Sequence, residues 1–214
     1  MEAVFFDLDG TLLDTAEDIR AHVNEMLRTF SYPEITREEV HGYIGDGAKK
    51  LIERCVPANA TNLEECFAYF SEHFSSSDNE HTVPYDGVYE LISALKARGV
   101  KIAVITNKPQ RAAVRILEKF FPEGTFDFIG GDSGMFDIKP DPSLTRYAAL
   151  TMHVALKNCV FVGDGEADVL TAKNVGMRSI SALWGYRTRQ QLTSAGAKEF
   201  ASSFGELAKF LENF

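Results

Sequence analysis

Short, nearly continuous apolar runs alternate along this chain with stretches of helical periodicity. The clearest runs are AVFF at residues 3–6, KIAVI at residues 101–105 and CVFV at residues 159–162, and shorter ones occur at residues 126–129 and 178–182. A run without polar alternation is typical of a strand that is buried on both faces, as in parallel sheets covered by helices. The pattern therefore favours a buried parallel sheet.

Between these runs, apolar residues recur at intervals of three or four positions, which places them on one face of a helix. Such stripes occupy residues 88–95, 113–120 and 169–175. Strands that alternate with helices form right-handed βαβ units. We therefore expect an α/β fold with a doubly wound, mostly parallel, Rossmann-like sheet.

The segment from about Thr15 to about Ser77 breaks this alternation, because it carries helical periodicity and no strand pattern. We expect Thr15 to cap the first helix of the segment, with Asp18 three residues on as its capping partner. Further helices are expected over residues 36–43, 48–56 and 63–74.

This break predicts a chain of two domains. Residues 15–81 are expected to form an all-helical domain that is inserted directly after the first strand. Residues 1–14 and 82–214 are expected to form the α/β core. No internal repeat or low-complexity segment suggests any other division.

Charge and cysteine content argue against several classes of protein. The formal net charge is −9, so the surface repels nucleic-acid backbones and no nucleic-acid partner is expected. The three cysteines are widely spaced and include no CxxC pair, which argues against a disulfide framework or a zinc site. No apolar run could span a bilayer and no signal-peptide pattern follows Met1, so we expect a cytoplasmic protein without a membrane partner. The oligomeric state is not predicted.

Polar side chains follow the apolar runs, at the ends where open parallel sheets bind ligands. Asp7 and Asp9 leave the first run two positions apart, so both carboxylates can point to the same side. One can attack a phosphorus atom while the other moves protons, and Gly10 permits a tight turn whose N–H groups could face phosphate oxygens. A polar strand exit with an Asx turn would have the same sequence.

Thr106 and Asn107 follow the second long run. At the start of a helix, a hydroxyl and a backbone N–H would form a phosphate site, although an ordinary N-cap looks the same. Lys139 precedes a proline-rich turn, where its ammonium could neutralise a phosphate. Most lysines, however, are solvated surface residues.

Asp164 and Asp168 follow the third long run. Asp164 lies at a strand end and suits Mg²⁺, which prefers hard oxygen ligands. Asp168 lies one helical turn further on, where it could orient metal-bound water or Lys139. The alternative is an Asp-Gly turn with acidic residues in the first helical turn.

Together and in this order, these segments are hard to explain as turns and caps. DLDGT at residues 7–11, the Thr106-Asn107 step, Lys139 and GDGEAD at residues 163–168 resemble the four motifs of the haloacid dehalogenase-like superfamily. The resemblance covers essentially the whole chain. The helical insertion after the first motif is similar to the small cap domain of that family.

The resemblance implies a Mg²⁺-dependent phosphatase that works through an aspartyl-phosphate. Asp7 would be the nucleophile, and Asp9 would be the general acid and base. Mg²⁺ would be held by Asp7, the backbone carbonyl of Asp9 and Asp164. The phosphate would be bound by Thr106, Asn107 and Lys139, and Asp168 would support the site from behind.

Two segments indicate a substrate class. Dehalogenases and phosphonate-cleaving relatives lack the second aspartate of the first motif. The presence of Asp9 at this position therefore points to the phosphatase and phosphomutase branch. The loop Gly45-Asp46-Gly47 resembles the substrate-facing loop of phosphoglycolate phosphatases, and the run WGY at residues 184–186 is similar to that group. The resemblance implies a small phosphorylated metabolite as substrate, with phosphoglycolate as the first candidate.

Some residues depart from that group. Gly165 stands where these enzymes often carry serine or threonine, and Asp141 stands where many phosphoglycolate phosphatases carry histidine. The carboxylate of Asp46 would disfavour an acidic leaving group if it pointed inward. Lys49 or Lys50 could counter that charge, and the sequence leaves open whether either contacts the substrate.

Three other functions are alternatives for the same motifs: a sugar phosphomutase, a pyrophosphatase and a non-catalytic phospho-acceptor switch. A β-phosphoglucomutase-like sugar phosphomutase would carry an arginine in the cap segment that corresponds to residues 41–50, and none is present there. Pyrophosphatase activity stays open. A non-catalytic phospho-acceptor switch, similar to receiver domains, would lack both the cap and a hydrolytic partner such as Asp9.

Overall fold

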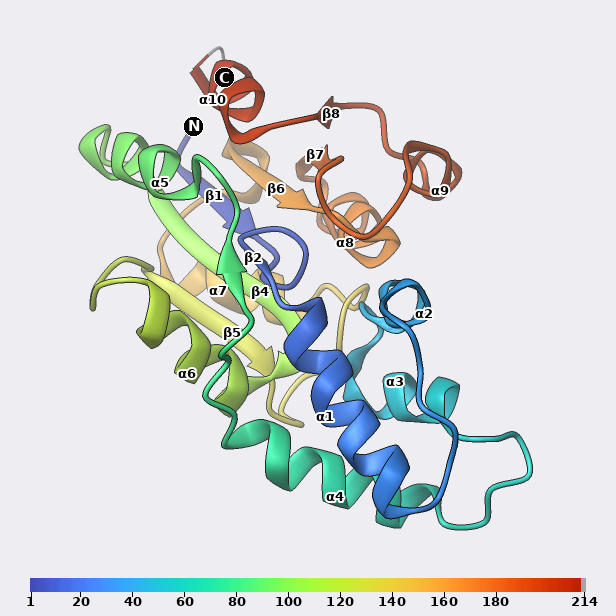
Figure 1. Ribbon diagram of the computed structural model, residues 1–214. Helices are drawn as coiled ribbons and strands as arrows, with labels where there is room; N and C mark the ends of the chain where they lie inside the picture. The colour runs from blue at the N-terminus through green and yellow to red at the C-terminus, as the bar shows by residue number, and fades with distance from the viewer. Residues whose placement is uncertain (213–214) are drawn as a thin grey trace.

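The computed structural model describes residues 1–212 (Figure 1). Its central feature is a six-stranded sheet whose neighbouring strands pair in parallel, in the order β5-β4-β1-β6-β7-β8. This arrangement confirms the predicted α/β fold with a mostly parallel, Rossmann-like sheet. The strands are β1 (Ala3–Phe6), β4 (Lys101–Pro109), β5 (Phe128–Asp132), β6 (Cys159–Gly163), β7 (Arg178–Ala182) and β8 (Phe200–Ala201).

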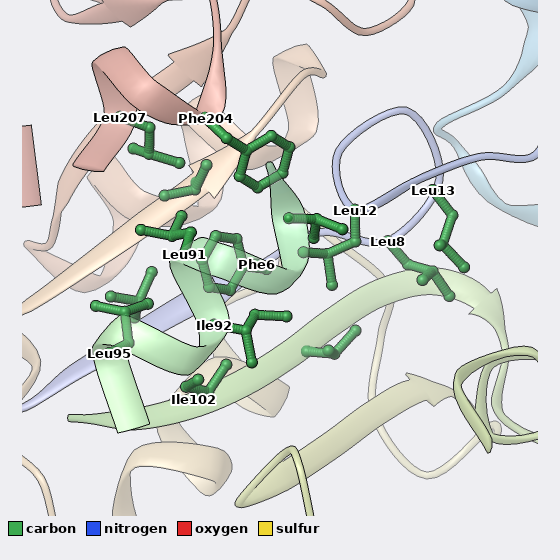
Figure 2. Close-up of a cluster of buried hydrophobic side chains, with 14 of the residues drawn as sticks. Phe6, Leu8, Leu12, Leu13, Leu91, Ile92, Leu95, Ile102, Phe204 and Leu207 are labelled. Carbon is green, nitrogen blue, oxygen red and sulfur yellow. The ribbon is translucent and has the colours of Figure 1, made fainter. Parts of the chain in front are cut away.

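β1 lies inside the sheet and is buried on both faces, which explains its continuous apolar run. Val4 and Phe6 enter one apolar cluster, and Ala3 and Phe5 enter another. Figure 2 shows Phe6 among side chains of the helices that cover the first face. That face is covered by α5 (Val88–Ala97), α6 (Gln110–Phe120) and α10 (Phe204–Glu212), and the other by α7 (Ser143–Thr151) and α8 (Glu166–Val175).

Some elements were missed or misplaced by the sequence patterns. The strand expected at residues 126–129 lies at Phe128–Asp132, because Phe126 packs instead on Phe121, with ring centroids 5.1 Å apart. No pattern predicted α7, β8, α10, the 3-10 helix η1 (Leu156–Asn158) or α9 (Arg189–Ala195). Within residues 1–212, no helix combines the length and the apolar character that a membrane span requires.

A second group of helices packs around its own apolar cluster. In Figure 1 it lies near the end of the sheet to which β1 and β4 point. It is connected to the sheet at a short antiparallel ribbon of β2 (Leu13–Asp14) and β3 (Val83–Pro84). Its helices, called the α1–α4 unit below, are α1 (Ala16–Thr29), α2 (Arg37–Tyr43), α3 (Gly47–Cys55) and α4 (Leu63–Ser75). The domain boundary at residues 15–81 stays a prediction.

Thr15 is the N-cap residue of α1, as predicted, but the expected capping hydrogen bonds with Asp18 are absent. Thr15 precedes the helix, but its side chain makes no capping hydrogen bond, and its hydroxyl donates instead to Oδ1 of Asp9 at 2.6 Å. Asp18 accepts from the N–H of His81 at 3.1 Å and from the hydroxyl of Thr82 at 2.6 Å. Both side chains therefore serve contacts with distant parts of the chain.

Candidate active site

The polar residues that follow the apolar runs converge at the carboxyl ends of three neighbouring strands. Asp7 follows β1, Thr106 lies near the end of β4, and Asp164 follows β6. Lys139 comes from the segment between β5 and α7. All four line one pocket with an empty volume of about 720 Å³, part of which is open to solvent, and side chains of the α1–α4 unit line its other side.

Lys139 bridges two buried carboxylates. Its ammonium lies 2.9 Å from Oδ1 of Asp7 and 2.7 Å from Oδ1 of Asp168. Burial by itself lowers the pKa of Lys139, but Asp168 and Asp7 outweigh this effect and raise the pKa above its ordinary value. Lys139 is therefore a fixed positive charge beside Asp7, while Asp168 holds it from the far side.

Asp7 and Asp164 carry more negative charge than Lys139 neutralises. Burial, with the charge of Asp168, raises the pKa of Asp7 to about 8 despite the nearby ammonium. The same two causes raise the pKa of Asp164 to about 7. A desolvated carboxylate without enough compensating charge is disfavoured relative to its neutral form.

Asp164 is held in place by the first motif and by the segment after β7. Its Oδ1 accepts from the hydroxyl of Thr11 and its Oδ2 from the N–H of Tyr186, both at 2.8 Å. A Cβ at Gly10 would lie 2.4 Å from Oδ2 of Asp164, and one at Gly185 would lie 2.3 Å from its Cβ. Glycine is therefore required at both positions, which gives the WGY run a structural role beside Asp164.

The buried carboxylates fit a divalent cation. Oxygen atoms of Asp7, Asp164 and Asp168 lie within 4.8 Å of one another. Such hard donors suit Mg²⁺, and a cation would offset the charge that raises the two pKa values. Asp168 already accepts from Lys139 and from the N–H of Gly165, so it is better suited to position Lys139 than to bind metal. The backbone carbonyl of Asp9 as a ligand stays a prediction.

Asp9 has a partner that the sequence analysis missed. Its Oδ1 accepts from Thr15 at 2.6 Å and from the ammonium of Lys108 at 2.8 Å. The Lys108 side chain is 2% exposed, and its ammonium lies 4.5 Å from the ring centroid of Phe74 in α4. The position of Lys108, directly after the Thr106-Asn107 step, was the signal that could have identified it.

Thr106 and Asn107 do not begin a helix. β4 continues to Pro109 and α6 begins at Gln110, so the predicted position of the two residues at a helix N-terminus is wrong, while phosphate binding by Thr106 stays a prediction. Both residues are buried in the pocket nevertheless. Thr106 keeps its hydroxyl proton available, because its oxygen accepts from the N–H of Lys108 at 3.2 Å.

The Asn107 side chain ties three segments together. Its Oδ1 accepts from the N–H of Lys139 at 2.7 Å, and its Nδ2 donates to the carbonyl of Lys139 at 3.0 Å. Nδ2 also donates to the carbonyl of Gly45 at 2.8 Å. Asn107 therefore positions Lys139 and the loop before α3, and its predicted phosphate contact stays a prediction.

The loop Gly45-Asp46-Gly47 lines the pocket, with φ values of +120° at Gly45 and +85° at Gly47 that favour glycine. The Asp46 carboxylate does not oppose an acidic leaving group, because it is paired with Arg54 of α3. Lys49 and Lys50 are exposed and pair with glutamates, at positions 64 and 53 respectively. Neither lysine lies among the described residues that line the pocket.

Arg187, another residue missed in the sequence, connects this loop to the core. Its Nε lies 2.9 Å from Oε2 of Glu166 at the start of α8. Its Nη1 donates to the carbonyl of His41, and its Nη2 donates to the carbonyl of Ile44 at 2.6 Å. The guanidinium therefore holds the C-terminal end of α2 against the strand ends.

Similarity to known proteins covers nearly the whole chain. A model of haloacid dehalogenase-like hydrolases matches residues 4–182. The phosphoglycolate phosphatase of Colwellia psychrerythraea is 32% identical, over 96% of this chain and 95% of its own. Phosphoglycolate phosphatase 1 of Pseudomonas aeruginosa is 34% identical, over 86% of this chain and 70% of its own. A Lactobacillus delbrueckii structure, for which phosphoglycolate phosphatase is a predicted function, is 27% identical, with a TM-score of 0.92 and coverage of 98% of both chains.

Proposed function

The chain belongs to the haloacid dehalogenase-like hydrolases and is a phosphoric monoester hydrolase, and we propose on this basis that it converts phosphoglycolate to glycolate and phosphate. The observation that carries this proposal is the similarity, over most of the chain, to proteins named phosphoglycolate phosphatase. On the side of the pocket toward the α1–α4 unit, Ile19, Leu51, Phe70 and Phe74 form an apolar part beside the loop Gly45-Asp46-Gly47, and this part favours a small leaving group. An apolar surface of this kind offers no hydrogen bonds to a sugar or a base.

In the proposed reaction, a carboxylate oxygen of Asp7 attacks the phosphorus atom while the bond from phosphorus to the ester oxygen breaks. Asp9 gives its proton to the departing glycolate oxygen, which leaves an aspartyl-phosphate on Asp7. Asp9 then takes a proton from water, whose oxygen attacks the same phosphorus. This second step releases phosphate and restores the Asp7 carboxylate.

Positive charge near Asp7 supports this assignment. The ammonium of Lys139, 2.9 Å from Asp7, and the hydroxyl of Thr106 would stabilise the equatorial phosphate oxygens in the transition state. Mg²⁺, when bound by Asp7 and Asp164, supplies charge that offsets the repulsion between these carboxylates and the phosphate. Asp168 and Asn107 would position Lys139 through its ammonium and its backbone.

We propose that residues 15–81 act as a cap domain over the core formed by residues 1–14 and 82–214. The core would bind the phosphate, which all substrates share, and the cap would contact the leaving group and exclude water. The hydrogen bond from Asn107 to Gly45 supports this role for the loop Gly45-Asp46-Gly47.

A sugar phosphomutase is the second candidate, since Arg187 supplies the pocket with an arginine that segment 41–50 lacks. The guanidinium, however, is already bound to Glu166 and to two backbone carbonyls, so it is poorly placed to bind a distal phosphate. Membership of a hydrolase family disfavours the non-catalytic phospho-acceptor switch.

The experiment that tests the proposal measures phosphate release from phosphoglycolate, hexose phosphates, nucleotides and pyrophosphate, first with Mg²⁺ and then with EDTA. We expect selective, Mg²⁺-dependent release from phosphoglycolate and none from Asp7→Asn. Release from another compound, such as pyrophosphate, would change the substrate. Interconversion of hexose phosphates without release would favour the mutase, and an active Asp7→Asn would contradict the covalent mechanism.

A further inference from the structure

Lys108 is a buried cation of the pocket that has no part in the reaction proposed above. Its ammonium lies 2.8 Å from Oδ1 of Asp9, the predicted acid and base. It also lies 4.5 Å from the ring centroid of Phe74. Lys108 is therefore located between the reacting groups and the wall that the α1–α4 unit contributes.

The other cations that line the pocket are bound to permanent partners. Lys139 lies between two buried aspartates, and Arg187 lies between Glu166 and two backbone carbonyls. Among residues 1–212, Lys108 has Asp9 as its one hydrogen-bond acceptor. Since an ammonium has three N–H donors, Lys108 can bind a further acceptor.

Part of the pocket lining beside Lys108 is apolar, since the ring of Phe74 lies against its ammonium. An anion that enters such surroundings loses its hydration, and only an ion pair or hydrogen bonds compensate for that loss. Lys108 offers the compensating charge at this place. Phe74 belongs to an apolar cluster whose members Ile19, Leu51 and Phe70 also line the pocket.

We propose that Lys108 binds the carboxylate of the leaving group, a role that rests on the proposed hydrolysis of phosphoglycolate. In this substrate, one carbon separates the carboxylate from the ester oxygen. The ester oxygen must approach within hydrogen-bond distance of Asp9 to receive a proton. Because the ammonium of Lys108 already lies 2.8 Å from Asp9, a carboxylate one carbon away from the ester oxygen comes within reach of its remaining N–H donors.

This additional ion pair makes Lys108 a specificity residue. A leaving group of similar size without an anion, such as ethanol, leaves Lys108 on Asp9 and gains no ion pair. Lys49 provides a matched control, because its ammonium is exposed and pairs with Glu64 at 2.7 Å. Both lysines carry the same charge, but of these two only Lys108 lines the pocket.

The test compares phosphoglycolate with ethyl phosphate in the wild type, Lys108→Met and Lys49→Met. We expect Lys108→Met to reduce the preference for phosphoglycolate, measured as the ratio of the two kcat/KM values, by roughly 10- to 100-fold. The loss should lie mainly in the KM for phosphoglycolate, and competitive inhibition by glycolate should weaken in parallel. Lys49→Met should keep the wild-type preference, and Lys108→Arg, which retains the charge, should restore part of it.

Two outcomes would overturn the inference. If Lys108→Met slows both substrates alike and keeps the preference, Lys108 only positions Asp9, and the proposed substrate still stands. If the wild type shows no preference for phosphoglycolate over ethyl phosphate, the substrate proposal fails, and the role of Lys108 fails with it. Lys108→Gln gives the same comparison if Lys108→Met is unstable.

Discussion

Asp7 and Asp164 place negative charge where water hardly reaches. Burial and the neighbouring Asp168 raise the pKa of Asp7 to about 8 and that of Asp164 to about 7. A carboxyl group whose pKa is higher in the folded protein than in the unfolded chain binds more protons in the folded state between those values. The ionisation of these two residues therefore makes the metal-free protein less stable as the pH rises from about 4 to about 8.

We predict that Asp164→Asn stabilises the metal-free protein at about pH 8, because it removes a buried charge that is poorly neutralised. The gain should shrink at about pH 5.5, where the wild-type Asp164 is mostly protonated. Saturating Mg²⁺ should reverse the order at the higher pH, since only the wild type retains both carboxylate ligands. Chemical unfolding at both pH values, with EDTA or with Mg²⁺, measures these differences.

The comparison with the variant also cancels a contribution of opposite sign. Burial lowers the pKa of His22 and His41 below the ordinary 6.5, so these residues add stability as the pH rises toward that value. Both histidines are present in the wild type and in Asp164→Asn. A variant that is less stable than the wild type at about pH 8 in EDTA would contradict the prediction.

The sequence could predict those site residues that follow recognisable strands. Asp7, Asp9 and Asp164 each follow an apolar run, and the structure brings them to one edge of the sheet, although their catalytic roles remain predictions. Lys108 follows an apolar run as well, but this position does not reveal which side chain it contacts. Its partner Asp9 is 99 positions away, and a local pattern contains no information about such a contact.

At the scale of elements, β4 extends beyond its apolar pattern. The strand includes Thr106, Asn107 and Lys108 and ends at Pro109. A Lys-Pro pair after polar residues is equally typical of a helix start, because proline is common in the first helical turn. The pairing of β4 with β5 decides in favour of the strand, because it continues to Pro109 opposite Asp132. The local sequence does not reveal this pairing.

We predict that Asn107→Ala lowers kcat by roughly 10-fold or more, because Lys139 loses the side chain that holds its backbone. The change also leaves the N–H of Lys139 without this partner in a buried site, which should cost about 1–3 kcal/mol of stability. Steady-state kinetics and chemical unfolding measure the two effects.

Asn107→Asp is the matched control. An aspartate can still accept from the N–H of Lys139 but cannot donate to the carbonyls of Lys139 and Gly45. Asn107→Asp should therefore be more stable than Asn107→Ala only when bound Mg²⁺ offsets the added negative charge. Wild-type kcat in Asn107→Ala would show that Lys139 is positioned by its aspartate partners alone.

The C-terminal end of α2 depends on a side chain from the loop after β7. Arg187 donates to the carbonyls of His41 and Ile44 while Glu166 holds the guanidinium. We predict that Arg187→Met raises KM for the substrate roughly 10-fold, because the pocket loop that follows Ile44 is no longer held against the core.

Arg187→Lys tests whether charge alone is sufficient. Lysine lacks the planar fork that contacts two carbonyls at once. The KM of Arg187→Lys should therefore lie closer to that of Arg187→Met than to that of the wild type. Limited proteolysis within residues 41–48 should accelerate in both variants. An unchanged KM in Arg187→Met would mean that the loop needs no support from this side.

At the scale of the whole molecule, the α1–α4 unit and the sheet are joined through a short ribbon. The chain passes between them at the ribbon of β2 and β3, which pairs only Leu13 with Pro84 and Asp14 with Val83. Sequence patterns predicted the helices of this unit to within one or two residues, since their apolar stripes are long. They could not predict a two-residue strand, because so short an element has no period to recognise.

The proposed cap role requires the α1–α4 unit and the core to separate and to close again around a ligand. Asn107 and Arg187 hold the segment from Ile44 to Gly45 in the arrangement described above. A ligand that contacts both the α1–α4 unit and the core should therefore protect the amides of both parts from hydrogen exchange. A ligand that binds only the core should protect only the strand ends.

We predict that Mg²⁺ with orthovanadate, which resembles a phosphoryl group in transfer, slows amide exchange at residues 44–48 and 106–108 together, by roughly 10-fold or more. Helix α10 lies on the sheet away from the pocket and serves as the internal control, with no change expected. In Asn107→Ala and Arg187→Met, the protection at residues 44–48 should fall while that at residues 106–108 persists. Protection confined to residues 106–108 in the wild type would mean that the α1–α4 unit does not close over the phosphate, and the cap assignment would have to be withdrawn.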